Sequence, residues 1–130
     1  MTLLFIIIVT LAVLMLVYMV WSLRNGRRKL SSQAHKKIMA LWFAMEQMHD
    51  PVRKVMEADA IFDRALKELG YEGVLGDKLK AAGPHISNLD AVWSAHKLRN
   101  RLAHEPGGAV SDSEVKGALS AFKKALKSFS

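Results

Sequence analysis

The sequence predicts an all-α protein, with an N-terminal single transmembrane helix followed by a small bundle of four to five helices. Three observations predict this fold class. A long uncharged apolar run opens the chain, apolar residues then recur at three- and four-residue spacing, and no stretch alternates with the period of a β-strand. We expect a transmembrane anchor over residues 1–23, a basic juxtamembrane linker over 24–33 and a cytosolic helical bundle over 34–130.

The predicted anchor is the apolar run of residues 3–23, LLFIIIVTLAVLMLVYMVWSL, which holds no charged side chain. About 20 apolar residues, at a rise of about 1.5 Å each, span the roughly 30 Å hydrocarbon layer of a bilayer. Tyr18 and Trp21 lie near its C-terminal end, where amphipathic rings favour the membrane interface. A cleaved signal peptide is the main alternative, but the run is too long and WSLR at residues 21–24 is a poor cleavage site.

The positive charge of the chain gathers directly after the apolar run. Of the formal net charge of +7, residues 24–37 contribute +6, and residues 38–130 contribute +1 from 13 basic and 12 acidic side chains. By the positive-inside rule, the C-terminal side of the anchor is cytoplasmic and the N-terminus lies outside, at the cell inner membrane. The bundle is close to neutral and lacks the positive surface that RNA binding usually needs. The predicted membrane-interface residues are Tyr18, Trp21, Arg24, Arg27, Arg28 and Lys29.

Local signals mark where the first bundle helices begin and end. Asn25-Gly26 is a hinge after the anchor, and Ser31-Ser32 begins a helix that His49-Asp50 ends. Asp50 then serves as N-cap of the next helix, with Pro51 at its first position, and Gly70 ends that helix. Both helices are therefore predicted within narrow limits.

The later helices follow from similar signals. After a turn over residues 71–76, a short helix covers 77–82 and ends at Gly83-Pro84. A fourth helix spans residues 88–104. The fifth begins at Ser111, which has capping-box spacing to Glu114.

Three of these helices carry an apolar stripe that we expect to face a common core. The first stripe consists of Ile38, Leu41, Trp42, Met45 and Met48. The second consists of Val55, Ala58, Phe62, Ala65, Leu66 and Leu69. The stripe of the last helix consists of Val115, Leu119, Phe122, Leu126 and Phe129.

The fourth helix differs, because its expected core face carries polar side chains. That face combines Leu89, Val92, Trp93, His96, Asn100 and Ala103, flanked by Arg99 and His104. His96, Asn100 and His104 are spaced four residues apart, so we expect them to form one row. Unpartnered buried polar groups cost roughly 1–3 kcal/mol each. The second helix offers Glu57, Asp59 and Asp63 as candidate partners.

Two interpretations of this polar row stay open. In the first, His96 and Asn100 form an internal hydrogen-bond network with an acidic partner such as Asp59, and this network fixes the register of the helix. His104 then interacts with the last carbonyls of its own helix. The second interpretation rests on a family resemblance.

Residues 99–104, RNRLAH, match the R-N-x-x-x-H pattern, so the chain resembles the HEPN (higher eukaryotes and prokaryotes nucleotide-binding) superfamily of helical bundles. Many members are metal-independent ribonucleases that act as dimers. The resemblance implies that Arg99 and His104 are the catalytic pair, with Asn100 beside them. An imidazole can transfer the proton of a 2′-hydroxyl, and a guanidinium can hold the phosphate. Pro106 stands where part of the superfamily has a tyrosine.

A second resemblance covers residues 40–128. Segments such as Glu57-Ala58-Asp59, Leu69-Gly70-Tyr71 and Arg99–Glu105 look like those of a group of membrane-anchored bacterial helical proteins. This resemblance implies the two-part layout and the helical fold, and it implies no activity.

Three hypotheses of function follow, in this order: a membrane-tethered interaction or scaffold module, a HEPN-like ribonuclease or RNA-binding effector, and a module that binds anionic lipid. The chain has no cysteine, its five histidines lack zinc-site spacing, and it has no glycine-rich phosphate loop. We therefore expect no metal and no cofactor. The expected partners are the lipid bilayer and a second copy or another protein, with RNA as the partner of the second hypothesis.

Overall fold

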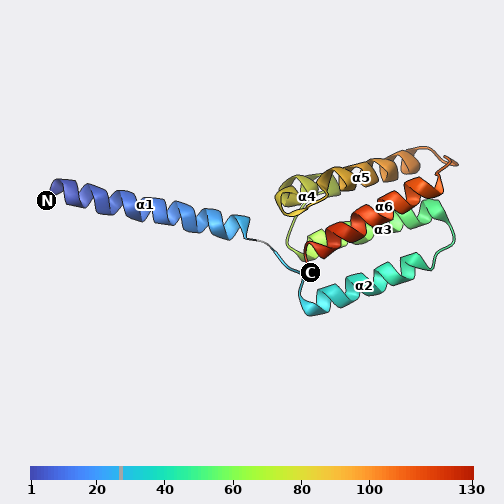
Figure 1. The fold of residues 1–130 in the computed structure, drawn as a ribbon, viewed down its shortest axis with the longest axis horizontal. Helices are drawn as coiled ribbons and strands as arrows, with labels where there is room; N and C mark the ends of the chain where they lie inside the picture. Colours follow the sequence, from blue (N-terminus) through green and yellow to red (C-terminus); the bar gives the residue numbers. More distant parts are fainter. Residues whose placement is uncertain (27) are drawn as a thin grey trace.

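The computed structural model describes residues 1–26 and 28–130, apart from the side chains of residues 23–25. In this part of the chain the fold is all-α, as predicted: an apolar N-terminal helix is followed by a helical bundle (Figure 1). Of the predicted membrane-interface residues, the Arg24 side chain and Arg27 lie outside the described residues. The helices are α1 (Thr2–Asn25), α2 (Ser32–Glu46), α3 (Pro51–Glu68), α4 (Leu75–Ala82), the 3-10 turn η1 (Gly83–His85), α5 (Leu89–His104) and α6 (Asp112–Lys127).

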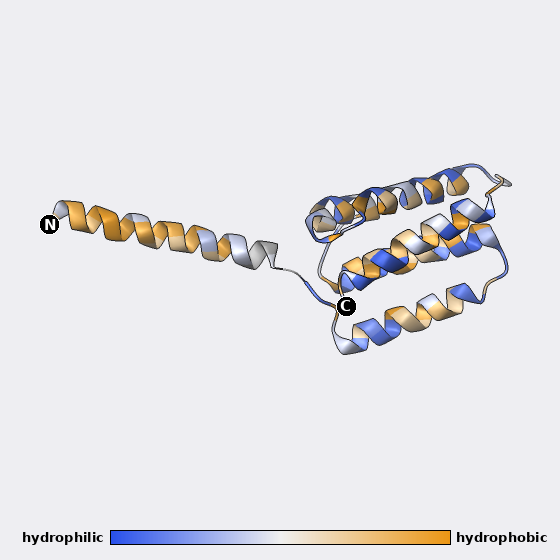
Figure 2. Ribbon diagram, in the orientation of Figure 1, coloured by the Kyte–Doolittle hydropathy of each residue, from blue (hydrophilic) through white to orange (hydrophobic). Residues whose placement is uncertain are grey.

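Helix α1 contains the predicted anchor and extends away from the bundle (Figure 1). Residues Thr2–Ser22 are long and apolar enough to span a membrane, and none of this stretch is buried within the protein. Figure 2 shows that α1 is apolar on all sides, whereas the bundle helices alternate between apolar and polar faces. Tyr18 and Trp21 are exposed near the end of α1, with their ring centroids 6.3 Å apart.

Helices α3 and α6 form the centre of the bundle. Helix α5 packs on both of them, α2 packs mainly on α3, and the short α4 closes one end (Figure 1). The Phe62 and Phe122 rings meet where α3 and α6 cross, 5.4 Å apart between centroids, and both side chains are fully buried. The stripes of α3 and α6 thus face a common core as predicted, with Leu119 of α6 only partly buried.

The predicted helix starts are confirmed by side-chain caps. The Ser31 hydroxyl accepts a hydrogen bond from the Ala34 amide, and the Asp50 carboxylate accepts from the Val52 amide at 2.9 Å. Ser111 and Glu114 form a complete capping box at the start of α6. These side chains bond amides that the first turn of a helix leaves unpaired.

Gly70 ends α3 as predicted. It has a φ of +89°, a left-handed conformation that glycine adopts without steric cost. A Cβ at this position would lie 3.2 Å from a guanidinium nitrogen of Arg28. The backbone conformation and the neighbouring side chain therefore both favour glycine here.

Three sequence predictions need correction. Helix α4 begins at Leu75, inside the predicted turn, although it ends at Ala82 before Gly83-Pro84 as predicted. Leu41 is exposed at the edge of α2. Ala103 is also exposed, because α5 is rotated so that Val92, Ala95 and Leu102 face the core.

The segment between α1 and α2 is fastened to one end of the bundle. Arg28 donates a hydrogen bond to the carbonyl of Leu69 at 3.0 Å, and its guanidinium lies over the Tyr71 ring, 4.4 Å from the centroid. The Leu30 amide donates to the carbonyl of Phe129 at 2.8 Å. The predicted linker is therefore packed against the ends of α3 and α6.

Candidate functional site

The polar residues predicted on the fourth helix meet helix α3 at Asp59. Asp59 is 5% exposed and is one of two buried charged residues in the described part of the chain. His96 Nδ1 lies 2.7 Å from Asp59 Oδ1. The edge of the Trp93 ring packs against the imidazole, with centroids 6.2 Å apart. Helices α3 and α5 are thus joined by a short polar contact beside the core.

Arg99 and Asn100 complete this polar cluster. Arg99 Nε lies 3.6 Å from Asp59 Oδ2, and Arg99 Nη1 donates to Asn100 Oδ1 at 3.1 Å. Asn100 Nδ2 lies 3.4 Å from His96 Nε2. We call Asp59, His96, Arg99 and Asn100 the polar cluster.

Burial governs the protonation of the central carboxylate. It raises the pKa of Asp59 above the ordinary value of 3.8, while the hydrogen bond from His96 and the charges of His96 and Arg99 act in the opposite direction. A carboxylate withdrawn from water loses solvation, and nearby cations restore part of that loss. Within the polar cluster, His96 and Arg99 therefore offset part of the cost of burying the Asp59 carboxylate.

Helix α4 adds a second ion pair next to the cluster. Lys78 is 4% exposed, and its Nζ lies 2.8 Å from Asp63 Oδ1. Buried lysines are rare unless they are paired. Of the three candidate partners for the polar row, Asp59 contacts it, whereas Asp63 bonds Lys78 of α4.

A pocket of about 470 Å³ opens over the polar cluster. Asp59, His96, Arg99 and Asn100 form its polar wall, and the start of α4 forms the opposite side. Arg99 Nε is buried and has no hydrogen-bond partner within the described residues. The exposed part of the Arg99 guanidinium is therefore the cationic group that faces the pocket.

His104 is not part of this arrangement. It lies exposed at the last position of α5, and it makes no hydrogen bond or ion pair to another described side chain. Arg99 and His104 are five residues apart, which turns their side chains about 140° from each other around a helix of 3.6 residues per turn. Within one copy of the chain, the residues implied as a catalytic pair do not meet.

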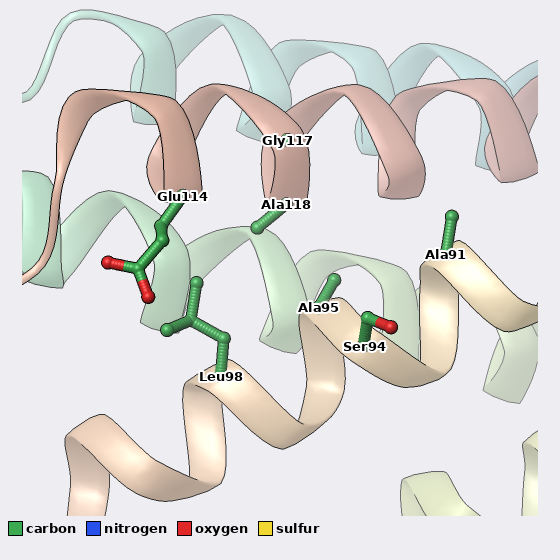
Figure 3. A pocket seen from close by; sticks show the side chains of 7 residues that line it. All are labelled: Ala91, Ser94, Ala95, Leu98, Glu114, Gly117 and Ala118. Atoms are coloured by element: carbon green, nitrogen blue, oxygen red, sulfur yellow. The ribbon is translucent and has the colours of Figure 1, made fainter.

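A second hollow lies between α5 and α6, on the other side of α5. Figure 3 shows small side chains on both helices facing a groove of about 350 Å³, with Leu98 and Glu114 at one end. The groove is lined by Ala91, Ser94, Ala95, Leu98, Glu114, Gly117 and Ala118. The sequence predictions did not include this groove, although five small residues within residues 91–95 and 117–118 could have indicated it.

Metal chemistry has no obvious place in this arrangement. Within residues 1–26 and 28–130, no three histidine, cysteine, aspartate or glutamate side chains gather closely enough to hold a metal ion. The polar cluster joins one carboxylate to one imidazole. Its other two groups, the Arg99 guanidinium and the Asn100 amide, are not metal ligands of the carboxylate or imidazole kind.

Comparison with known proteins gives no further constraint: no family model, curated protein or solved structure matches this chain.

Proposed function

We propose that the chain is a single-pass membrane protein whose bundle, α2 to α6, is an interaction module on the cytoplasmic side. The anchor part of this proposal rests on α1, which is long, apolar and uncovered. Leaving such a surface in water is unfavourable by about 25 cal/mol for each Å² of apolar area. The basic residues that follow α1 favour a cytoplasmic bundle, with the N-terminal side of α1 outside.

The observation that favours an interaction module over an enzyme is the internal pairing of the polar cluster. Asp59 contacts both His96 and Arg99, while Asn100 bonds both of them in turn. Polar groups paired in this way fix the relative position of two helices. His104, the second half of the implied catalytic pair, lies apart and exposed.

The groove between α5 and α6 is the surface that we assign to the partner. Its lining is mostly apolar, and Gly117 and the alanines leave room for a closely approaching backbone. Small residues permit helices to approach closely, and apolar pockets hold the anchoring side chains of protein interfaces. The partner we propose is a helix of another membrane-associated protein that presents an apolar side chain.

Photo-crosslinking tests this assignment. A photoreactive amino acid replaces Ser94 in the groove of the membrane-inserted full chain, and a matched chain carries it at Ser113, which is exposed outside the groove. We expect one discrete adduct from position 94 and none from position 113. Leu98→Lys, which places a charge in the groove, should abolish the adduct. Equal labelling from both positions, or labelling that survives Leu98→Lys, contradicts the proposal.

A second candidate is the HEPN-like ribonuclease, and one observation favours it. The Arg99 side chain is 36% exposed and lines an open pocket, where a phosphate oxygen could accept a hydrogen bond from its guanidinium. Because His104 of the same copy lies apart, this candidate requires a second copy of the chain to bring a histidine to the pocket.

RNA cleavage without metal tests this candidate. The full chain in detergent micelles should cleave RNA as a dimer, and Arg99→Ala and His104→Ala should each abolish cleavage. Arg101→Ala is the matched control, because Arg101 pairs with Glu114 at the surface, 2.8 Å away. If the dimeric chain leaves RNA intact, or if both variants still cleave, the ribonuclease candidate fails.

A further inference from the structure

We infer that the bundle rests with one defined end on anionic lipid headgroups of the membrane that holds α1. We call this the basic end. It comprises the linker from Arg28, the first turn of α2, and the last turns of α3 and α6, which the contacts of Arg28 and Leu30 hold together. The inference rests on the proposed membrane anchor, and it adds an orientation and a lipid partner.

Chain length brings the basic end close to the membrane. The apolar stretch ends at Ser22, and α1 continues to Asn25. Arg28 is then already fastened to Leu69 and Tyr71 of the bundle. A helix rises about 1.5 Å per residue and an extended chain at most about 3.6 Å, so the connection from Ser22 to Arg28 spans about 15 Å at most. This distance is about twice the thickness of one headgroup layer.

The exposed charges at the basic end suit an anionic surface. The end carries six exposed lysines: Lys29, Lys36, Lys37, Lys67, Lys124 and Lys127. The exposed acids in these turns and in the following loop are Glu68 and Glu72, and α4 with the start of α5, at the same end of the bundle, adds exposed Asp77, Asp90 and Lys80, so the basic side chains remain in excess. Lysines near the surface of a membrane with anionic lipid each favour binding by about fivefold, and the cytoplasmic leaflet is the anionic one.

The opposite end of the bundle has a different charge. Its loops and the flanking helix turns expose five acids, Glu46, Asp50, Glu105, Asp112 and Glu114, and one arginine, Arg53, while Lys54 and Arg101 are half-buried. The near-neutral total for the bundle therefore conceals a separation of charge along its long direction. The short connection from Ser22 to Arg28 holds the basic end next to the lipid. The length of the connection and the distribution of charge therefore favour the same orientation of the bundle.

Site-specific quenching tests the orientation. The chain has no cysteine, so a single introduced cysteine carries one fluorophore. Ser130→Cys reports on the basic end and Ser113→Cys on the opposite end, and both positions are exposed. The full chain is placed in nanodiscs of phosphatidylcholine, with or without phosphatidylserine, that carry a headgroup-linked quencher. We expect strong quenching at position 130 with phosphatidylserine, weaker quenching without it, and little at position 113 in either lipid.

Lysine-to-glutamine variants show whether the basic end contacts anionic lipid or is merely held near the membrane by α1. Lys124→Gln with Lys127→Gln should reduce the ratio of membrane-bound to detached bundle by about fivefold per lysine in phosphatidylserine, and should leave it unchanged in neutral lipid. Lys97→Gln with Lys116→Gln removes the same charge from exposed positions away from the basic end and should change nothing. Equal quenching at position 130 in both lipids, or equal loss in both double variants, overturns the inference.

The same nanodiscs also show whether the proposed orientation is wrong or the proposed membrane anchor itself is wrong. If the labelled chain does not copurify with the discs, the anchor proposal fails. If it copurifies but positions 113 and 130 are quenched alike, the anchor stands and the proposed resting orientation is wrong.

Discussion

His96 Nδ1 and Asp59 Oδ1 lie 2.7 Å apart and join α5 to α3 at the edge of the hydrophobic core. Asp59 is almost completely buried, so this contact supplies hydrogen bonding that water supplies in the unfolded chain. Arg99 approaches the second oxygen of the same carboxylate. Asp59 therefore ties α5 to α3 through two side chains of α5, in addition to the apolar packing of α5 on α3 and α6.

The contribution of Asp59 to stability should decrease as pH rises. Burial raises its pKa above 3.8, so the folded chain binds this proton more tightly than the unfolded chain. The contribution is fully present below 3.8 and is lost as pH rises through the raised pKa. We expect the free energy of unfolding of the native chain, minus that of Asp59→Asn, to fall over this window. Urea unfolding of the full chain in micelles measures it, and a difference that rises with pH contradicts the prediction.

Arg99 and His104 should differ in their effect on stability. Arg99→Ala removes a guanidinium that contacts Asp59 and Asn100, and we expect a loss of about 1 kcal/mol, since the arginine is partly exposed. His104→Ala at an exposed helix end should stay within about 0.5 kcal/mol. Chemical unfolding of both variants measures this asymmetry. An equal loss in the two variants would mean that His104 has a structural partner.

Phe122→Ala should be among the most damaging substitutions. It removes a fully buried ring that packs on Phe62 at the α3–α6 crossing, at an expected cost of about 3–5 kcal/mol. Phe43→Ala is the matched control, because Phe43 is 64% exposed on α2 and should lose less than about 0.5 kcal/mol. Both values come from the midpoint of urea unfolding. Similar losses for the two phenylalanines would contradict the packing described for α6.

Loss of the capping box of α6 should destabilise the bundle, whereas the same substitution at the neighbouring Ser113 should not. Ser111→Ala removes the hydroxyl that accepts a hydrogen bond from the Glu114 amide at 3.1 Å, with an expected loss of about 1 kcal/mol. Ser113→Ala changes the same residue type without touching the box, and should be neutral. Hydrogen exchange of the Glu114 amide should accelerate in the first variant alone.

Removal of the Arg28 side chain should loosen the linker from the bundle. Arg28→Ala loses the hydrogen bond to Leu69 and the stacking on Tyr71, and Lys29→Ala serves as the control at an exposed neighbouring position. We expect faster hydrogen exchange at the Leu30 amide, which bonds Phe129, in the first variant only. Unchanged exchange would show that the Leu30 contact holds without Arg28.

Helices α3 and α6 could be predicted almost to the residue because their signals are local. Asp50-Pro51 and the Ser111–Glu114 box define the starts, and the apolar spacing defines the buried faces. Helix α4 was predicted two residues late, since Val74 caps it without a side-chain hydrogen bond.

The polar cluster was predicted only in part. Asp59, His96 and Asn100 were named correctly as a possible network, since four-residue spacing on α5 makes His96 and Asn100 neighbours. The rotation of α5 depends on its packing against α3 and α6, so Ala103 was wrongly placed in the core. Lys78 was missed, because nothing in a short helix indicates which lysine tertiary packing will bury.

The attachment of Arg28 and Leu30 also has a mechanical consequence. Helix α2 is the next element along the chain, but the two attachments lie just after α3 and α6. A pull on α1 would therefore act first on the ends of the two central helices, α3 and α6, before it reaches α2. Helix α2 buries Ile38, Trp42 and Met45 in the common core, and it would bear this load only once both attachments had separated.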